Sequence, residues 1–112
     1  MVANKPSMTR PTVYQFNHGD FVVTNILEGF LLRDDLHPVT GTNASAAEVE
    51  AVAEANRIPF PNFEHQFVPT LVDTGEKLIA FDPGFGDKSS QPNAGHYNDR
   101  LADAGYDRND VD

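Results

Sequence analysis

The sequence predicts a single α+β domain built mainly from an antiparallel or mixed sheet with covering helices. Two pairs of β-rich runs are each joined by residues typical of tight turns, and both pairs are typical of hairpins. A helix with an explicit start signal lies between the two pairs. A second helical pattern follows near the end of the chain. This combination of hairpins and helices places the chain in the α+β class.

The first predicted hairpin joins Thr12–Phe16 to Phe21–Leu27 through the turn residues Asn17–Asp20. Alternation of polar and apolar residues predicts a half-exposed first strand, while the second reads as more deeply buried. Glu28 and Gly29 then break the pattern before the apolar triplet Phe30–Leu32. A loop composition follows over residues 33–43.

The first helix begins after Ser45, which forms the capping-box pattern Ser-x-x-Glu with Glu48. Its apolar positions follow helical spacing but make only a narrow face, so we expect it to lie on the surface. We expect Pro59 and Pro61 to end it, because proline cannot continue a helix.

The second predicted hairpin joins Thr70–Val72 to Leu78–Phe81 through the turn residues Asp73–Glu76. Pro69 indicates an edge strand or a bulge just before it. We expect the strand Leu78–Phe81 to be buried and to stop abruptly at Asp82.

Gly95–Ala104 is predicted to be the second helix, with Gly105 at its C-terminal cap. Val111 indicates that another strand begins near the last residues. We expect residues 1–11 to form a flexible tail and residues 12–112 to belong to one domain, without internal repeats.

Composition narrows the class of function. The chain has 112 residues, is 39% hydrophobic and 22% charged, and carries a net charge of −9, so a globular protein without affinity for nucleic acid is expected. No apolar run is long enough for a membrane span, and the N-terminus lacks the apolar segment of a signal peptide. The absence of cysteine excludes disulfides, thiolate zinc sites and a cysteine nucleophile.

Neither a metal site nor a serine nucleophile is visible in the sequence. The histidines, His18, His37, His65 and His96, are far apart and form no ligand motif. No serine has the strand–elbow–helix context of a nucleophile.

Two aspartates are candidates for chemistry. Asp73-Thr74-Gly75 resembles the signature of homodimeric aspartic proteases, in which two such carboxyl groups share a proton, but an ordinary hairpin turn explains it better. Asp82 ends a strand and is followed by Pro83-Gly84-Phe85-Gly86, where backbone can approach a ligand closely. From the residue pattern alone, Asp82 is equally well explained as a structural turn residue and as a site residue.

The ordered set of motifs resembles the first half of a metallo-β-lactamase-fold hydrolase, closest to the branch of methyl parathion hydrolases, lactonases and esterases. The motifs that carry this resemblance are Phe21–Gly29, Leu71–Ile79, Phe81–Gly86, the helix around Leu101 to Gly105, and the segment Asp107–Asp112. The resemblance implies one half of a four-layer αββα sandwich. Glu28 stands where this branch usually has Asp, and Pro83 where Thr is commoner.

In this family a His-x-His-x-Asp-His motif follows the segment that Arg108–Asp112 resembles, and it helps to bind two metals, usually zinc. The resemblance therefore implies that all metal ligands lie beyond Asp112, that the chain contains no catalytic residue, and that it is inactive and metal-free by itself. It assigns Asp82, Gly84 and Gly86 to the support of the metal site. It also assigns Phe30, Leu31 and Leu32 to a possible substrate pocket.

Two functional readings follow. The first is an N-terminal part of a zinc-dependent hydrolase in which a metal-bound hydroxide attacks a small-molecule ester, lactone or phosphotriester. The second is a non-catalytic α+β domain that works by self-association, because half a sandwich leaves an apolar sheet face uncovered. If the 112 residues are the whole molecule, we expect a homo-oligomer. The compartment stays open between cytoplasm and, after removal of a signal, periplasm.

Overall fold

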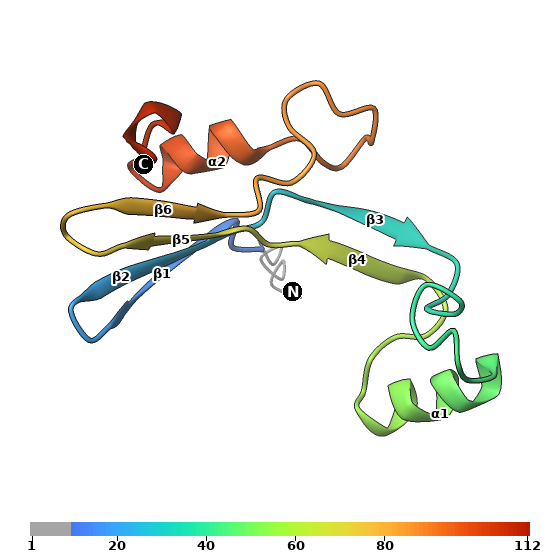
Figure 1. Ribbon diagram of the computed structural model, residues 1–112. Helices are drawn as coiled ribbons and strands as arrows, with labels where there is room; N and C mark the ends of the chain where they lie inside the picture. The colour runs from blue at the N-terminus through green and yellow to red at the C-terminus, as the bar shows by residue number, and fades with distance from the viewer. Residues whose placement is uncertain (1–9) are drawn as a thin grey trace, which may run out of the picture.

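The computed structural model describes residues 10–112 and contains two separate antiparallel sheets (Figure 1). Residues 1–9 of the predicted tail lie outside the described residues. The larger sheet has the strand order β1-β2-β5-β6. Its strands are β1 (Val13–His18), β2 (Phe21–Ile26), β5 (Thr70–Asp73) and β6 (Leu78–Phe81). The two predicted hairpins, β1–β2 and β5–β6, are therefore confirmed, and they lie side by side.

The smaller sheet is a two-stranded ribbon of β3 (Gly29–Arg33) and β4 (Phe63–Phe67). It extends away from the larger sheet, and helix α1 (Ala46–Ala55) lies near its far end (Figure 1). The predicted break at Glu28 and Gly29 is confirmed, because β2 ends at Ile26 and β3 begins at Gly29. These residues mark the point where the chain passes from β2 of one sheet to β3 of the other.

Helix α2 (Tyr97–Asp103) covers one face of the larger sheet (Figure 1). A single apolar core forms between them, because Tyr97 and Leu101 lie one helical turn apart and point toward the sheet. Their partners from β2, β5 and β6 are Ile26, Leu71 and Leu78. The main core of the described chain is therefore small and belongs to this sheet and α2.

Helix α1 begins as predicted, with Ser45 and Glu48 forming both hydrogen bonds of the capping box. It ends at Ala55, before Pro59, because the αL conformation of Arg57 (φ 57°) already turns the chain away from the helix axis. The expectation that Pro59 and Pro61 end the helix is wrong, because the helix ends about one turn before Pro59. Among its residues only Ala53 is buried, so α1 covers no sheet face.

The topology corrects one further expectation. Strand β6 is an edge strand of the sheet, and its residues Ile79 and Phe81 are exposed, so it is not the buried strand that its apolar run suggested. The last residues form a short 3-10 helix (Arg108–Asp110), after which Val111 is extended, and the strand expected to begin there stays a prediction. After it, the Asp112 backbone N–H donates to the Leu78 carbonyl at 2.9 Å, so this segment lies beside β6.

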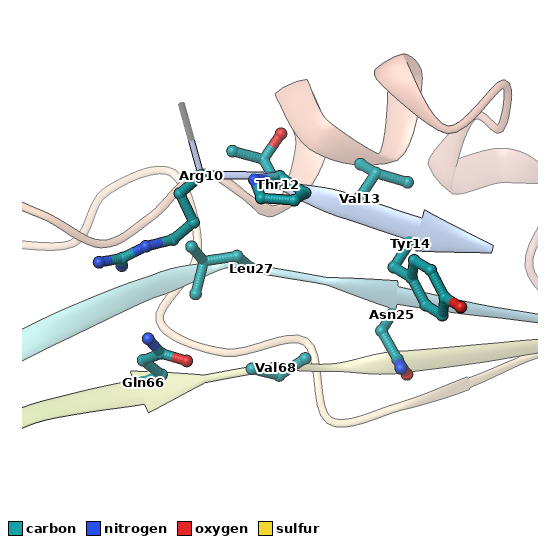
Figure 2. A pocket seen from close by; sticks show the side chains of 9 residues that line it. Arg10, Thr12, Val13, Tyr14, Asn25, Leu27, Gln66 and Val68 are labelled. Atoms are coloured by element: carbon teal, nitrogen blue, oxygen red, sulfur yellow. The ribbon is translucent and has the colours of Figure 1, made fainter. Parts of the chain in front are cut away.

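The described chain is extended. Its Cα radius of gyration is 17.5 Å, whereas a compact domain of this length has about 13 Å. The sheet and the ribbon meet at a bend, and a hollow of about 300 Å³ lies there. Figure 2 shows Tyr14, Leu27 and Val68 bordering this hollow, with Asn25 and Gln66 as polar neighbours.

Candidate functional site

The loop after β6 has the tight geometry expected of a strand end that is followed by glycines. Asp82 is exposed, and its side-chain Oδ1 accepts a hydrogen bond from the Gly84 N–H at 3.0 Å. Asp82 has φ 59°, a conformation that Asp tolerates better than most residues because its side chain can bond locally. The structure therefore gives Asp82 a turn-forming role.

Glu28 lies beneath this loop and is completely buried. Its Oε1 accepts two backbone hydrogen bonds, from Phe85 N–H at 3.1 Å and from Gly95 N–H at 2.8 Å. Phe85 belongs to the loop after β6, and Gly95 to the loop before α2. One carboxyl oxygen thus holds together two points, ten residues apart, of the single loop that connects β6 to α2.

The second oxygen of Glu28, Oε2, has no hydrogen-bond partner among the described residues. A buried polar atom without a partner is unfavourable, because it loses water without gaining a replacement. Arrangements of this kind are concentrated where a structure needs a particular geometry. The burial of Glu28 with one unpartnered oxygen is therefore the feature of this region that most needs an explanation.

Two glycines allow the backbone to approach closely around Glu28. A Cβ on Gly84, which has φ 76°, would lie 2.5 Å from the Cγ and Cδ atoms of Glu28. A Cβ on Gly29 would lie 2.3 Å from the Cα of Ala94. Both distances are far shorter than a van der Waals contact. The loop after β6, the start of β3 and the loop before α2 therefore meet at positions where only glycine fits.

Gly86, the third predicted supporting residue, does not touch Glu28 and begins a separate turn. Its carbonyl accepts a hydrogen bond from Ser89 N–H at 3.1 Å. The ring of Phe85 packs edge-on against Phe67 of β4, with 4.9 Å between ring centroids. The structure brings Asp82, Gly84 and Gly86 into the loop that connects β6 to α2. Their support of a metal site stays a prediction.

The triplet Phe30–Leu32 lies on β3, so its side chains alternate between the two faces of the ribbon. The three residues border a hollow of about 440 Å³ together with Gln91 and Pro92. Phe30 is also held by Phe30 N–H donating to the Asn93 carbonyl at 3.0 Å. The role of this hollow in binding a substrate stays a prediction.

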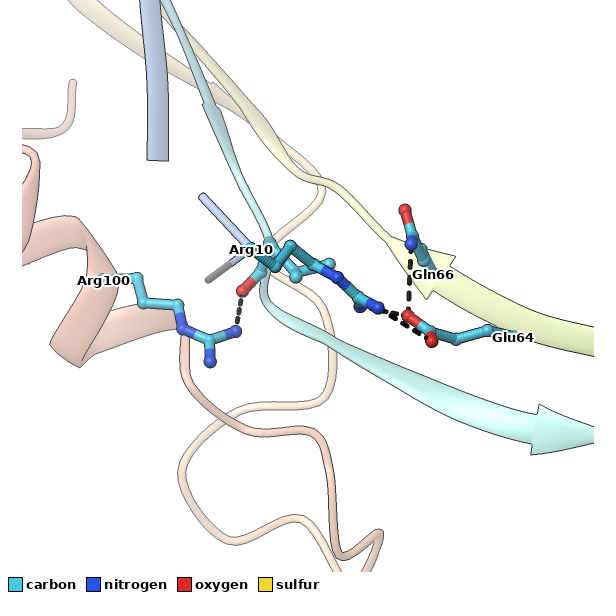
Figure 3. Close-up of polar contacts among 5 residues, drawn as sticks. Arg10, Glu64, Gln66 and Arg100 are labelled. Carbon is cyan, nitrogen blue, oxygen red and sulfur yellow. Dashed lines mark hydrogen bonds and ion pairs between the residues drawn. The ribbon is translucent and has the colours of Figure 1, made fainter. Parts of the chain in front are cut away.

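Two arginines tie this junction together (Figure 3). Arg10 forms a two-pronged ion pair with Glu64 of β4, and this hydrogen bonding lowers the pKa of the Glu64 carboxyl group. The Arg10 guanidinium also lies over the ring of Phe30, 5.4 Å from its centroid. Arg100 of α2 donates a hydrogen bond to the Leu27 carbonyl, which links the helix to the passage from β2 to β3.

A metal ion does not fit the residues present. Within residues 10–112, no three His, Asp or Glu side chains are close enough to hold one. His37 contacts the Ala44 carbonyl through Nε2 at 2.9 Å, and His65 accepts a hydrogen bond from Arg33 at 3.1 Å. His18 lies at the end of β1 and His96 precedes α2. The histidines are thus scattered over the described residues.

Asp73 lies in the β5–β6 turn and bonds to it. Its Oδ1 accepts a hydrogen bond from Gly75 N–H at 2.8 Å, while Thr74 and Lys77 close the turn. The hairpin-turn interpretation of Asp73-Thr74-Gly75 is confirmed.

From the sequence, Glu28 was noted as a break in the β pattern and as a departure from a family pattern, without a functional role. The available signal was its position, a charged residue between the apolar Ile26-Leu27 and Phe30-Leu31. A charged residue that interrupts an apolar run is either a bend toward solvent or a buried group with partners. Only the structure shows that Glu28 is a buried group with partners, because it places Gly84, Phe85 and Gly95 around this side chain.

Comparison with solved structures identifies the fold. The dizinc quorum-quenching lactonase AidC, in complex with the product N-hexnoyl-L-homoserine, matches with a TM-score of 0.74 and 21% identity, covering 88% of this chain and 33% of that chain. The hydrolase AbOPH of the β-lactamase superfamily matches with a TM-score of 0.77 and 21% identity, covering 94% of this chain and 35% of that chain. The chain has the fold of a metallo-β-lactamase half.

This chain spans about a third of the length of each of these two proteins. No protein-family model matches its sequence, and comparison with curated proteins finds no match. Neither described helix has the length and apolar character needed to cross a membrane. The likeness shows the fold and leaves the activity to be proposed.

Proposed function

We propose that this chain forms the part of a metal-dependent hydrolase that carries no metal ligand. The observation that carries the proposal is the match of about nine-tenths of the chain to two hydrolases, one of them a dizinc lactonase. The substrates are small molecules with an ester-like bond, namely esters, lactones or phosphotriesters. Two zinc ions, held by residues outside this sequence, supply the activated water.

The residues of this chain position the segments that border such a site. Asp82 and Gly84 form the turn after β6, and Glu28 fixes this turn to the loop before α2. Gly86 continues the same loop, and Phe30, Leu31 and Leu32 border the hollow where an apolar substrate group would enter. None of these residues is assigned a step in the reaction.

The experiment that tests this proposal is the intact mass and metal content of the protein purified from its native source. A mass well above the 12.3 kDa of this chain, with about two zinc ions per polypeptide, supports the proposal. A mass of 12.3 kDa without bound metal contradicts it. The isolated 112-residue chain, assayed with zinc and an acyl-homoserine lactone, is the matched control and should show no hydrolysis above buffer.

A further inference from the structure

The ribbon of β3 and β4 is contacted on both of its faces by other parts of the described chain. Pairing register places Phe30 and Glu64 on one face of the ribbon and Phe67 on the other. On the second face, Phe67 packs edge-on against Phe85 of the loop that connects β6 to α2. On the first face, the contact comes from Arg10. The ribbon thus lies between two supports that belong to different ends of the chain.

The backbone alone fixes the angle between the ribbon and the larger sheet only weakly. Two stretches of chain cross the bend, the passage from β2 to β3 and the passage from β4 to β5. They pair with each other, since the Glu28 N–H donates to the Phe67 carbonyl at 3.0 Å. Two paired strands twist more freely than a wide sheet and have little stability without further contacts. The contacts on the two ribbon faces therefore decide its orientation.

The contact from the first face is made by the three residues that precede β1, Arg10, Pro11 and Thr12, which we call the strap. Its base is fixed to the larger sheet, because the Leu27 N–H donates to the Thr12 carbonyl at 2.8 Å. The ring of Pro11 fixes its own φ and stiffens the strap. Arg10 and Thr12 lie along the hollow at the bend (Figure 2).

Arg10 contacts both strands of the ribbon. Its two terminal nitrogens pair with the two carboxylate oxygens of Glu64 on β4, and Gln66 donates to the same carboxylate at 3.1 Å (Figure 3). The guanidinium also lies over Phe30 on β3, 5.4 Å from the ring centroid. A rotation of the ribbon away from the strap breaks both contacts at once.

The geometry of this ion pair matters more than its strength. The side chains of Arg10 and Glu64 are 46% and 27% exposed, and an ion pair of this kind adds little to the free energy of unfolding. Two parallel hydrogen bonds between planar groups nevertheless fix their relative direction. The expected effect of the contact is therefore on the orientation of the ribbon.

We propose that the strap fixes the angle between the ribbon and the larger sheet, and that the ribbon rotates about the bend when Arg10 loses its contact with Glu64. The loop that connects β6 to α2 then supports the ribbon on one face only. Such a rotation moves Phe30 and Leu32 relative to Gln91, so it changes the shape of the hollow that these residues border. The proposal concerns this chain by itself and is independent of the hydrolase proposal.

The experiment measures the distance between two nitroxide labels on the 112-residue chain by pulsed electron paramagnetic resonance. The chain has no cysteine, so Asp20→Cys and Asp34→Cys together give a single labelled pair. Asp20 lies in the β1–β2 turn and Asp34 directly follows β3, and both are exposed. We expect one narrow distance distribution in this labelled chain and a clearly broader one after Arg10→Ala.

Two further variants locate the effect. Glu64→Gln should broaden the distribution as Arg10→Ala does, and combining the two should add nothing, because both remove the same contact. Arg108→Ala is the matched control, since it removes the same charge from the exposed 3-10 helix, and it should leave the distribution unchanged.

Three results overturn the proposal. The first is a distribution that stays narrow in both Arg10→Ala and Glu64→Gln. The second is a broad distribution in the labelled chain with its strap intact, because the angle is then not fixed. The third is equal broadening by Arg108→Ala, because the effect would then come from net charge. If Arg10→Ala does not fold, Glu64→Gln decides, since it leaves the strap unchanged.

Discussion

At the scale of single residues, the junction of sheet and ribbon depends on the contact between Glu28 and Gly84. Glu28 supplies one acceptor for two backbone N–H groups, while Gly84 leaves the space that the Glu28 side chain occupies. The two requirements are coupled, because a side chain on residue 84 would fill the position of the Glu28 carboxyl group. This coupling explains why the loop after β6 can lie so close to the passage from β2 to β3.

Replacing Gly84 with alanine should show how much this close approach contributes. Gly84→Ala adds a methyl group 2.5 Å from Glu28 and also forces alanine into a φ of 76°. We expect a loss of about 2–4 kcal/mol in the free energy of unfolding, measured by urea denaturation. The matched control is Gly75→Ala, where φ is 89° and no atom lies within 4 Å. It should cost only about 1 kcal/mol, and equal losses for the two variants would contradict the steric explanation.

Glu28 itself is expected to contribute through its hydrogen bonds. Glu28→Ala leaves the N–H groups of Phe85 and Gly95 without their acceptor and creates a cavity, so we expect a loss of about 2–4 kcal/mol in the free energy of unfolding. Glu28→Gln keeps an oxygen that can accept both hydrogen bonds and should cost clearly less. A Glu28→Ala loss below about 1 kcal/mol would contradict the role assigned to this side chain.

At the scale of elements, the two helices are stabilised differently. Helix α2 has Tyr97 and Leu101 in the core, so tertiary packing holds it. Helix α1 buries only Ala53 and depends more on its own capping box. An exposed cap is a local interaction, and its loss should affect α1 without unfolding the larger sheet.

The capping box predicts a pH dependence of α1. Hydrogen bonding from the Ser45 backbone N–H lowers the pKa of Glu48 in the folded state. A lowered pKa means that this contribution to helix stability is present above the unfolded pKa of glutamate and is lost as pH falls through the folded value. We expect the α1 amide signals in NMR spectra to lose their helical chemical shifts over that acidic range before those of α2.

Glu48→Gln is the control, because glutamine can accept the same hydrogen bond from Ser45 but does not titrate. The acidic transition of α1 should disappear in this variant. A transition of unchanged size would show that another group controls it.

At the scale of the whole molecule, the chain is two bodies joined at a bend. The larger sheet with α2 holds the core, whereas the ribbon and α1 extend from it and account for the radius of gyration of 17.5 Å. The larger sheet is covered on one face only.

Much of the fold could be predicted from local sequence. Turn residues between β-rich runs are sufficient for the hairpins β1–β2 and β5–β6, and Ser45 with Glu48 is sufficient for the start of α1. These features depend on residues within a few positions of each other, so their chemistry is visible in the sequence. The position of Asp82 at the end of β6 and its bond to Gly84 belong to the same group.

Contacts between distant segments could be decided only by the tertiary structure. The apolar run Leu78–Phe81 reads as buried, but strand order makes it an edge strand with Ile79 and Phe81 exposed. Glu28 reads as a break in a strand, although it is buried against residues 57 and 67 positions away. Burial and hydrogen-bond partners depend on which strands become neighbours, and local propensity does not encode that order. The sequence by itself determined the hairpins and the capped helix, and the tertiary structure decided which sheet face is open and which carboxyl group holds the junction.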